Sequence, residues 1–164
     1  MSFNSLFDAT SYFETVSEVS ESWDLVKNTP NHSEILGTHL FRRMYETAPN
    51  DVIWKAYSFS REDVEEKSEK FLVFAKRFTR MLDVAVSMLG PDLDTLQEAM
   101  YDLGAMHERY EVMPHHYDLM GEALVYALEH VLEPHHYTPA TKKAWKELYA
   151  FMAENMMEGA SDLW

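Results

Sequence analysis

The stretch LGAMHERYEVMPHHYDLMGEALVYALEHVL, residues 103–132, contains the end of one amphipathic helix and the whole of the next. The first helix carries an apolar stripe spaced by three and four residues, and the next step of four reaches His107. That stripe consists of Leu93, Leu96, Met100 and Leu103. Pro114 begins the second helix, whose own stripe extends to Val131. His107 is therefore either a core histidine hydrogen-bonded to the backbone, which periodicity alone favours, or a ligand for a buried group.

Two copies of PHHY, at residues 114–117 and 134–137, flank this second helix. A helix of about 18 residues is roughly 27 Å long, so the two histidine pairs cannot share one metal ion. Adjacent histidines on a helix point about 100° apart, so neither pair is a natural chelate. Glu133 and His136 have E-x-x-H spacing, but Pro134 interrupts the helix and a di-iron site needs a second copy. We expect solvated histidines at two corners.

The rest of the chain predicts further helices separated by short breaks. Apolar spacing predicts a first helix over about residues 16–26, and Asn31 or Ser33 is expected to cap a second helix that ends near Pro49. The aromatic but aperiodic segment 50–62 predicts a short helix or turn followed by a loop.

The second half of the chain continues the pattern. A long amphipathic helix with an aromatic face is expected over residues 62–89, with Ser60 and Asp63 as its cap. Thr138 and Pro139 open a final helix. Every element expected is a helix, so the sequence predicts an all-α protein.

Composition supports one helical domain and excludes several classes of function. The 164 residues are 46% hydrophobic, with only 5 Gly and 6 Pro, which favours helices around a single core. A net charge of -14 repels phosphate backbones and anionic lipids, so we expect no nucleic acid and no membrane partner. The absence of cysteine removes disulfides and thiolate metal sites. The start of the chain has no basic segment followed by a long apolar run, so a soluble, cytoplasmic protein is expected.

Residues 103–132 resemble the end of helix F and all of helix G in the globin family, in which LGxxH carries the proximal haem ligand. YTPATKKAWKELYAFMAENM, residues 137–156, resembles globin helix H, and the likeness extends from about residue 16. It is nearest to neuroglobins and single-domain bacterial globins. The resemblance implies one globin domain over residues 1–164, built as a 3-over-3 sandwich of helices A–H. A short N-terminal extension over about 1–12 and a frayed tail over about 159–164 complete it.

The same resemblance implies a haem site. It makes His107 the axial ligand to the iron of haem b, with Gly104 one turn earlier to allow close approach. The distal position usually held by His or Gln is occupied by Phe74, and a second distal position by Phe41. No hydrogen-bond donor is therefore expected to face bound oxygen. The remaining expected haem contacts are Trp54, Tyr57, Phe71, Arg77, Phe78, Leu103, Val112 and Tyr117.

Three of these contacts keep an alternative. Trp54 and Tyr57 reproduce the aromatic-x-x-aromatic spacing of the corner that stacks on haem, but only if one residue is deleted relative to Pro49, and both are equally well explained as core aromatics. Arg77 resembles the basic residue that pairs with a haem propionate, or it is a solvated cation on an acidic protein.

The function implied is reversible binding of a diatomic gas, O2 or else NO or CO, for oxygen storage, transport or sensing. The alternative is a haem enzyme, a nitric oxide dioxygenase or pseudo-peroxidase, which would need an external reductase because the chain has no flavin or nicotinamide domain. A third reading is a globin fold without haem that acts as an interaction module. We expect a monomer or a homodimer.

Overall fold

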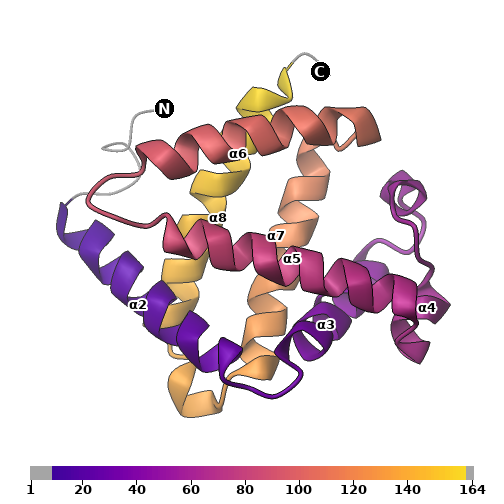
Figure 1. Cartoon of the computed structure of the whole chain (residues 1–164), viewed down its shortest axis with the longest axis horizontal. Helices are drawn as coiled ribbons and strands as arrows, with labels where there is room; N and C mark the ends of the chain where they lie inside the picture. The colour runs from indigo at the N-terminus through magenta and orange to yellow at the C-terminus, as the bar shows by residue number, and fades with distance from the viewer. Residues whose placement is uncertain (1–8, 162–164) are drawn as a thin grey trace.

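The computed structural model describes residues 9–161, which form seven α-helices and three 3-10 helices and contain no strand (Figure 1). The α-helices are α2 (Ala9–Lys27), α3 (His32–Thr47), α4 (Arg61–Glu66), α5 (Glu69–Ser87), α6 (Asp94–His107), α7 (Pro114–Val131) and α8 (Pro139–Gly159). The 3-10 helices are η1 (Val52–Ala56), η2 (Glu108–Tyr110) and η3 (Pro134–His136). The predicted all-α class is confirmed. No helix in the described part combines the length and apolar content needed to cross a bilayer.

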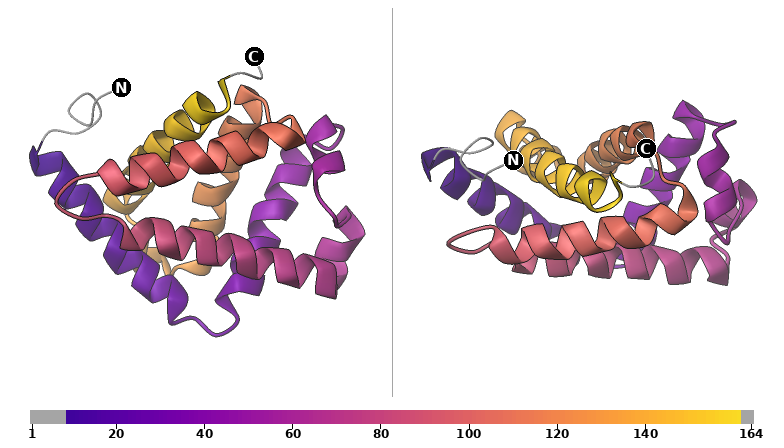
Figure 2. Two further views of the ribbon diagram at one scale, coloured as in Figure 1. Left: turned by 45° about the horizontal axis from the view of Figure 1, so that its top comes forward. Right: turned by 90° about the horizontal axis from the view of Figure 1, so that it is seen from above.

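The helices form two layers. In Figure 1, α5 and α6 run antiparallel across the front of the molecule, with α2 beside them, while α7 and α8 cross behind at a steep angle. The view from above separates the same two groups, with α5 and α6 along one side and α7 and α8 along the other (Figure 2). The most extensive contacts join α6 to α8, which links the front layer to the rear one. The next most extensive contacts join α3 to α7.

Two glycines let helix backbones approach closely. A Cβ atom added to Gly104 on α6 would lie 1.9 Å from the carbonyl oxygen of Met156 on α8. A Cβ added to Gly37 on α3 would lie 2.8 Å from the Cβ of Ala75 on α5. Any side chain at position 104 would therefore push α6 away from α8, because the neighbouring atom belongs to a backbone that cannot rotate aside.

Helix boundaries differ from the prediction in the middle of the chain. The single helix expected over 62–89 is wrong, because Lys67 adopts a left-handed conformation (φ 53°) and separates α4 from α5. Ser68 then caps α5 by accepting a hydrogen bond from the Phe71 amide. The cap predicted from Ser60 and Asp63 is present as a reciprocal capping box.

Other helix ends also differ from the sequence prediction. Of the two predicted N-cap residues, Asn31 occupies the N-cap position of α3 and Ser33 lies within the helix, but Asn31 is left-handed (φ 60°) and its side chain makes no capping hydrogen bond. The first helix begins at Ala9 rather than near residue 16, and α8 continues to Gly159, after which Ala160 is fully buried. Residues 1–8 and 162–164, which include most of the expected extension and part of the expected tail, lie outside the described residues.

Candidate functional site

His107 ends α6 in a geometry that leaves one ring nitrogen available. Its Nδ1 lies 2.8 Å from the carbonyl oxygen of Leu103, one turn earlier, so Nδ1 carries the proton and donates it to that carbonyl. Burial lowers the pKa of His107 below its usual value, against the opposing effect of the hydrogen bond to Leu103. No described residue makes a hydrogen bond to Nε2, so His107 presents a neutral imidazole with a free lone pair.

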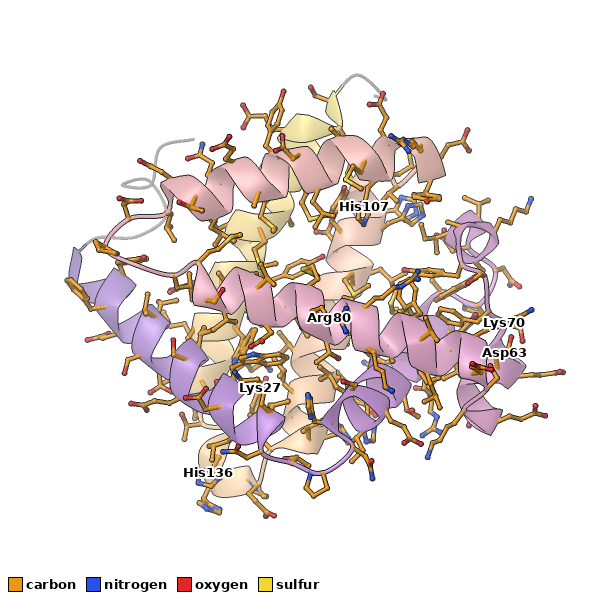
Figure 3. The ribbon with its side chains drawn as sticks, in the orientation of Figure 1. Lys27, Asp63, Lys70, Arg80, His107 and His136 are labelled. Carbon is orange, nitrogen blue, oxygen red and sulfur yellow. The ribbon has the colours of Figure 1, made fainter. Side chains whose placement is uncertain are left out.

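The position of His107 follows from the packing of α6. Figure 3 shows this side chain near the C-terminal end of α6, on the side toward α5 in that view. Gly104 fixes how close α6 lies to α8, so the role expected for Gly104 is realised against a helix backbone. Leu96 and Met100 anchor the same helix in the core, whereas Leu103 and His107 stay half-buried. Along the face that carries Leu96 and Met100, the last turn of α6 therefore keeps accessible surface where the earlier turns are buried.

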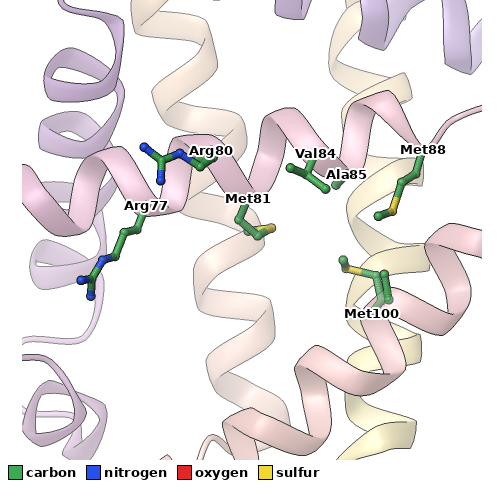
Figure 4. A pocket seen from close by; sticks show the side chains of 8 residues that line it. Arg77, Arg80, Met81, Val84, Ala85, Met88 and Met100 are labelled. Atoms are coloured by element: carbon green, nitrogen blue, oxygen red, sulfur yellow. The ribbon is translucent and has the colours of Figure 1, made fainter.

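A groove of about 320 Å3 opens between α5 and α6. Methionines from both helices line it, including Met81 and Met88 on α5 and Met100 on α6 (Figure 4). Arg77 and Arg80 lie at one end of this groove, and both side chains are exposed. Neither arginine forms an ion pair with any residue that the structure describes, which agrees with both alternatives for Arg77, a partner for a propionate or a solvated cation. Arg80 was not predicted.

A cluster of aromatic rings fills the far end of the molecule between α3, α5 and the segment after η1; we call it the distal cluster. Phe41, fully buried, stands at its centre. Its ring centroid lies 5.4 Å from Phe74 and 6.4 Å from Phe78, both on α5. Phe74 and Phe78 keep accessible surface, as residues lining a slot would, whereas Phe71 is fully buried. The distal cluster consists of Phe41, Tyr57, Phe59, Phe71, Phe74 and Phe78.

Phe71 and Phe59 revise the expected set of contacts. Phe71 packs edge-on against Phe41 at 6.0 Å and against Phe59 at 5.4 Å and is fully buried, so it is an interior member of the distal cluster with no accessible surface for the expected haem contact. Phe59 is 4% exposed and was not singled out from the sequence, although it lies 5.2 Å from Phe74. In the sequence, Phe59 is one aromatic residue in an aperiodic segment, so its spacing does not indicate which way its side chain faces.

Trp54 and Tyr57 have different main partners, although their ring centroids also lie 5.8 Å apart. Trp54 stacks on Tyr45 with ring centroids 3.8 Å apart, and its indole N–H donates to the Ala48 carbonyl at 2.7 Å. Tyr57 instead sits edge-on between Phe41 and Phe74, 5.3 Å from each. Of these two predicted contacts, only Tyr57 belongs to the distal cluster. The distal cluster is wholly aromatic, and Tyr57 is its one phenol.

Val112 and Tyr117 form a second small cluster with Ile53 and Ala153, and Tyr57 packs against it. The Tyr117 backbone carbonyl accepts a hydrogen bond from the Tyr149 hydroxyl at 2.6 Å. The Tyr117 hydroxyl itself is buried without a partner. The two predicted contacts after His107 are therefore brought together, and they meet the distal cluster through Tyr57.

The first PHHY motif makes contacts that the sequence could not indicate. His115 and His116 both reach the carboxylate of Asp51, at 2.9 and 2.6 Å, and His116 is buried. The expectation of solvated histidines is therefore wrong for His116. Burial would raise the pKa of Asp51, but hydrogen bonds from the Ile53 amide and the two imidazoles outweigh it and lower the pKa to about 2.

This group, Asp51 with His115 and His116, has the composition of a metal site but not its chemistry. Nδ1 of His116 accepts a hydrogen bond from the Met113 amide at 2.8 Å, so the ring proton must be on Nε2, the atom that faces Asp51. A metal at Nε2 would require the proton on Nδ1, where the amide already donates. The three side chains therefore fasten η1 to the start of α7.

The comparisons with known proteins agree with this geometry. The family model described as Globin matches residues 38–156. Neuroglobin from Danio rerio is 33% identical over 144 residues, which cover 86% of this chain and 87% of that protein. Neuroglobin from Tetraodon nigroviridis is 30% identical over 141 residues, covering 84% and 85%. The crystal structure of a hexacoordinated heme protein from an anhydrobiotic tardigrade at pH 4 has a TM-score of 0.75 at 19% identity, covering 94% of this chain and 96% of that one.

Two layers of helices, with no strand in the described residues, together with these matches define an all-α globin fold. The chain belongs to the globin family, and within it the chain is neuroglobin-like.

Proposed function

We propose that the protein holds haem b in the slot between α5 and α6, with His107 as the only protein ligand to iron, and that the iron reversibly binds a diatomic gas. The observation that carries this proposal is the state of the His107 ring. Its Nδ1–H is committed to the Leu103 carbonyl, so the neutral ring offers Nε2, and that hydrogen bond raises the basicity of the ligand atom.

The surrounding residues suit a haem that is held without a covalent link. The chain has no cysteine, so thioether attachment is not available. Phe74, Phe78 and Leu103 offer apolar surface on both sides of the slot and exclude water from it. Arg77 is exposed at one end of the groove and free to pair with a propionate. When bound, the haem iron supplies the site at which the gas is held.

The distal residues support an open sixth position on the ferrous iron. The tardigrade protein is described as hexacoordinated, but a second axial ligand needs a lone pair on the distal side. Phe74 and Phe41 have none, no histidine lies in the distal cluster, and burial raises the pKa of the Tyr57 phenol, which therefore stays protonated and is a poor ligand for ferrous iron. Ferrous haem in this protein is therefore expected to be five-coordinate and ready to bind gas.

Optical spectra of the ferric, ferrous and CO-bound forms test the proposal directly. We expect a Soret band, a high-spin five-coordinate ferrous spectrum and a reversible shift with CO. His107→Ala should lose haem or bind it weakly, whereas His135→Ala, which changes an exposed corner residue, should leave every spectrum unchanged. A normal ferrous-CO spectrum in His107→Ala would refute the assignment of the ligand, and no Soret band after haem is supplied would refute the proposed function.

A further inference from the structure

Two histidines from different helices lie side by side at the interface between α3 and α7. The ring centroids of His39, on α3, and His130, on α7, are 5.0 Å apart, and their planes are inclined by 34°. His39 is half-buried and His130 is exposed, so the pair is open to solvent. Neither histidine was singled out from the sequence, because each stands alone on its own helix.

Both histidines keep ring nitrogens available. Nδ1 of His130 lies 2.8 Å from the carbonyl oxygen of Tyr126, one turn earlier, so in the neutral ring Nδ1 carries the proton and Nε2 keeps its lone pair. No described residue makes a hydrogen bond to Nε2 of His130 or to either ring nitrogen of His39. The Tyr126 ring packs against His130 at 4.2 Å, and Arg43 of α3 lies 4.7 Å from the centre of that tyrosine ring. These contacts hold His130 against α3.

The electrostatics around the pair favour neutral imidazoles. Burial lowers the pKa of His39 from its ordinary 6.5, and His130 and two nearby cations lower it further, so His39 is neutral at pH 7. Each of these cations is paired with a carboxylate, Arg42 with Glu65 at 2.9 Å and Lys67 with Glu34 at 3.5 Å. Their positive charges are therefore largely compensated beside the two rings.

The separation of the rings matches two ligands on one ion. Zn–N bonds of about 2.1 Å place the centroids of two imidazoles on a tetrahedral ion roughly 5 Å apart. The observed 5.0 Å between His39 and His130 therefore requires no movement of either helix. Among the described residues, no third imidazole or carboxylate closes on this pair. An ion held here keeps water in its remaining positions, so its binding is weaker than at a closed four-ligand site.

We propose that His39 and His130 together bind a late divalent transition metal ion, such as Zn2+, and that the ion links α3 to α7. Neutral imidazole suits zinc, copper and nickel, whereas Mg2+ prefers oxygen ligands. Because both ligands are in place only when the two helices are packed, the ion stabilises the folded state. The site lies at the end of α7 that leads into η3, and in Figure 3 His136 of η3 and His107 lie on opposite sides of the molecule. The inference is independent of the proposed function.

The test is the shift in the unfolding midpoint that Zn2+ produces in the metal-stripped, full-length protein. Zn2+ should raise the midpoint of the unaltered protein. His39→Gln should abolish this rise and weaken Zn2+ binding, measured by isothermal titration calorimetry, by about tenfold or more, because one of two linked ligands is lost. His130→Gln should act alike, and the double variant should lose no more than either single variant, since one ion needs both rings. Each shift is taken against the same variant without metal, so differences in basal stability cancel.

His135→Gln is the matched control, because His135 also lies beside another histidine, His136, with ring centroids 3.9 Å apart, but both belong to the short helix η3. This variant should keep the full response to Zn2+, and Mg2+ should shift the midpoint of none of the proteins. No response to Zn2+ in the unaltered protein, or a full response in His39→Gln, would overturn the site. Loss of the response in His135→Gln would assign it to the second PHHY motif instead, and an equal response to Mg2+ would assign it to carboxylates, so either result also overturns the proposal.

Discussion

The two sides of the proposed haem slot are built in different ways. On the proximal side, His107 and the carbonyl that orients it are four residues apart on one helix. On the distal side, Phe41, Tyr57 and Phe74 come from three separate elements and meet only in the folded protein. The proximal geometry is therefore set by local helix structure and by where α6 rests, whereas the distal geometry depends on the whole fold.

This difference predicts which changes spread and which stay local. A change that moves α6 moves the ligand nitrogen and must alter haem binding as well as stability. A change to one distal ring leaves α6 in place, so it should alter how gas is held and leave the attachment of haem intact. The predictions below test that division, beginning with the largest effect.

The largest effect is expected from Gly104→Ala. The added Cβ would overlap the carbonyl oxygen of Met156, so α6 must move away from α8. Overpacking of this kind should lower the free energy of unfolding by about 3 kcal/mol and weaken haem retention, because His107 moves with the helix. Chemical denaturation and haem transfer to an acceptor protein measure the two quantities.

Gly90→Ala is the control for this change, because a Cβ at that position meets no atom within 4 Å. It should leave stability within about 0.5 kcal/mol of the starting value and haem retention unchanged. Equal losses in the two variants would mean that glycine flexibility matters and the contact between α6 and α8 does not.

A smaller and more local effect is expected from Phe74→His. An imidazole at this position offers a lone pair to the sixth site, so the ferrous spectrum should change from five-coordinate to low-spin six-coordinate. If about 90% of the protein becomes six-coordinate, the apparent rate of CO binding falls about tenfold, since only the open fraction can react. Haem retention should not fall, which is the contrast with Gly104→Ala.

Val73→His provides the comparison for this distal change. Val73 precedes Phe74 but is 42% exposed, so a histidine there should face solvent and leave the iron five-coordinate. A low-spin ferrous spectrum in the unaltered protein would show that a side chain outside the distal cluster already reaches the iron.

The sequence predicted the helix that carries His107 well because its signals are local. The stripe leading to His107 has the period of a helix, and the Leu103 carbonyl is placed by that same period. The break at Lys67 was missed because hydrophobic spacing continues across it, and only the left-handed residue and the Ser68 cap mark the boundary. Hydrophobic periodicity shows which face of a helix is buried. It does not detect a single residue, such as Lys67, whose backbone angles are not helical.

The distal side could not be predicted to the same depth. Trp54 and Tyr57 were equal candidates because their segment is aperiodic, and the choice between them depends on Tyr45 and Phe41, which lie on another helix. His116 was expected to be solvated because its partner, Asp51, is 65 residues away. Contacts of this kind are decided by how elements meet, and no local pattern encodes them.

The smallest effect is expected where η1 is fastened to α7. The pKa of Asp51 falls from an ordinary 3.8 to about 2 in the folded protein, so its ionised form stabilises the fold above pH 4, and that stabilisation is lost as the pH falls toward 2. Allowing for partial screening by solvent, Asp51→Asn should lower the free energy of unfolding by about 1 kcal/mol at neutral pH, and the difference should vanish near pH 2. Asp102→Asn, which changes an exposed residue on α6, should show no such dependence. Asp51→Asn should leave haem retention unchanged, and a variant that loses haem instead would show that the two sides of the proposed slot are not independent.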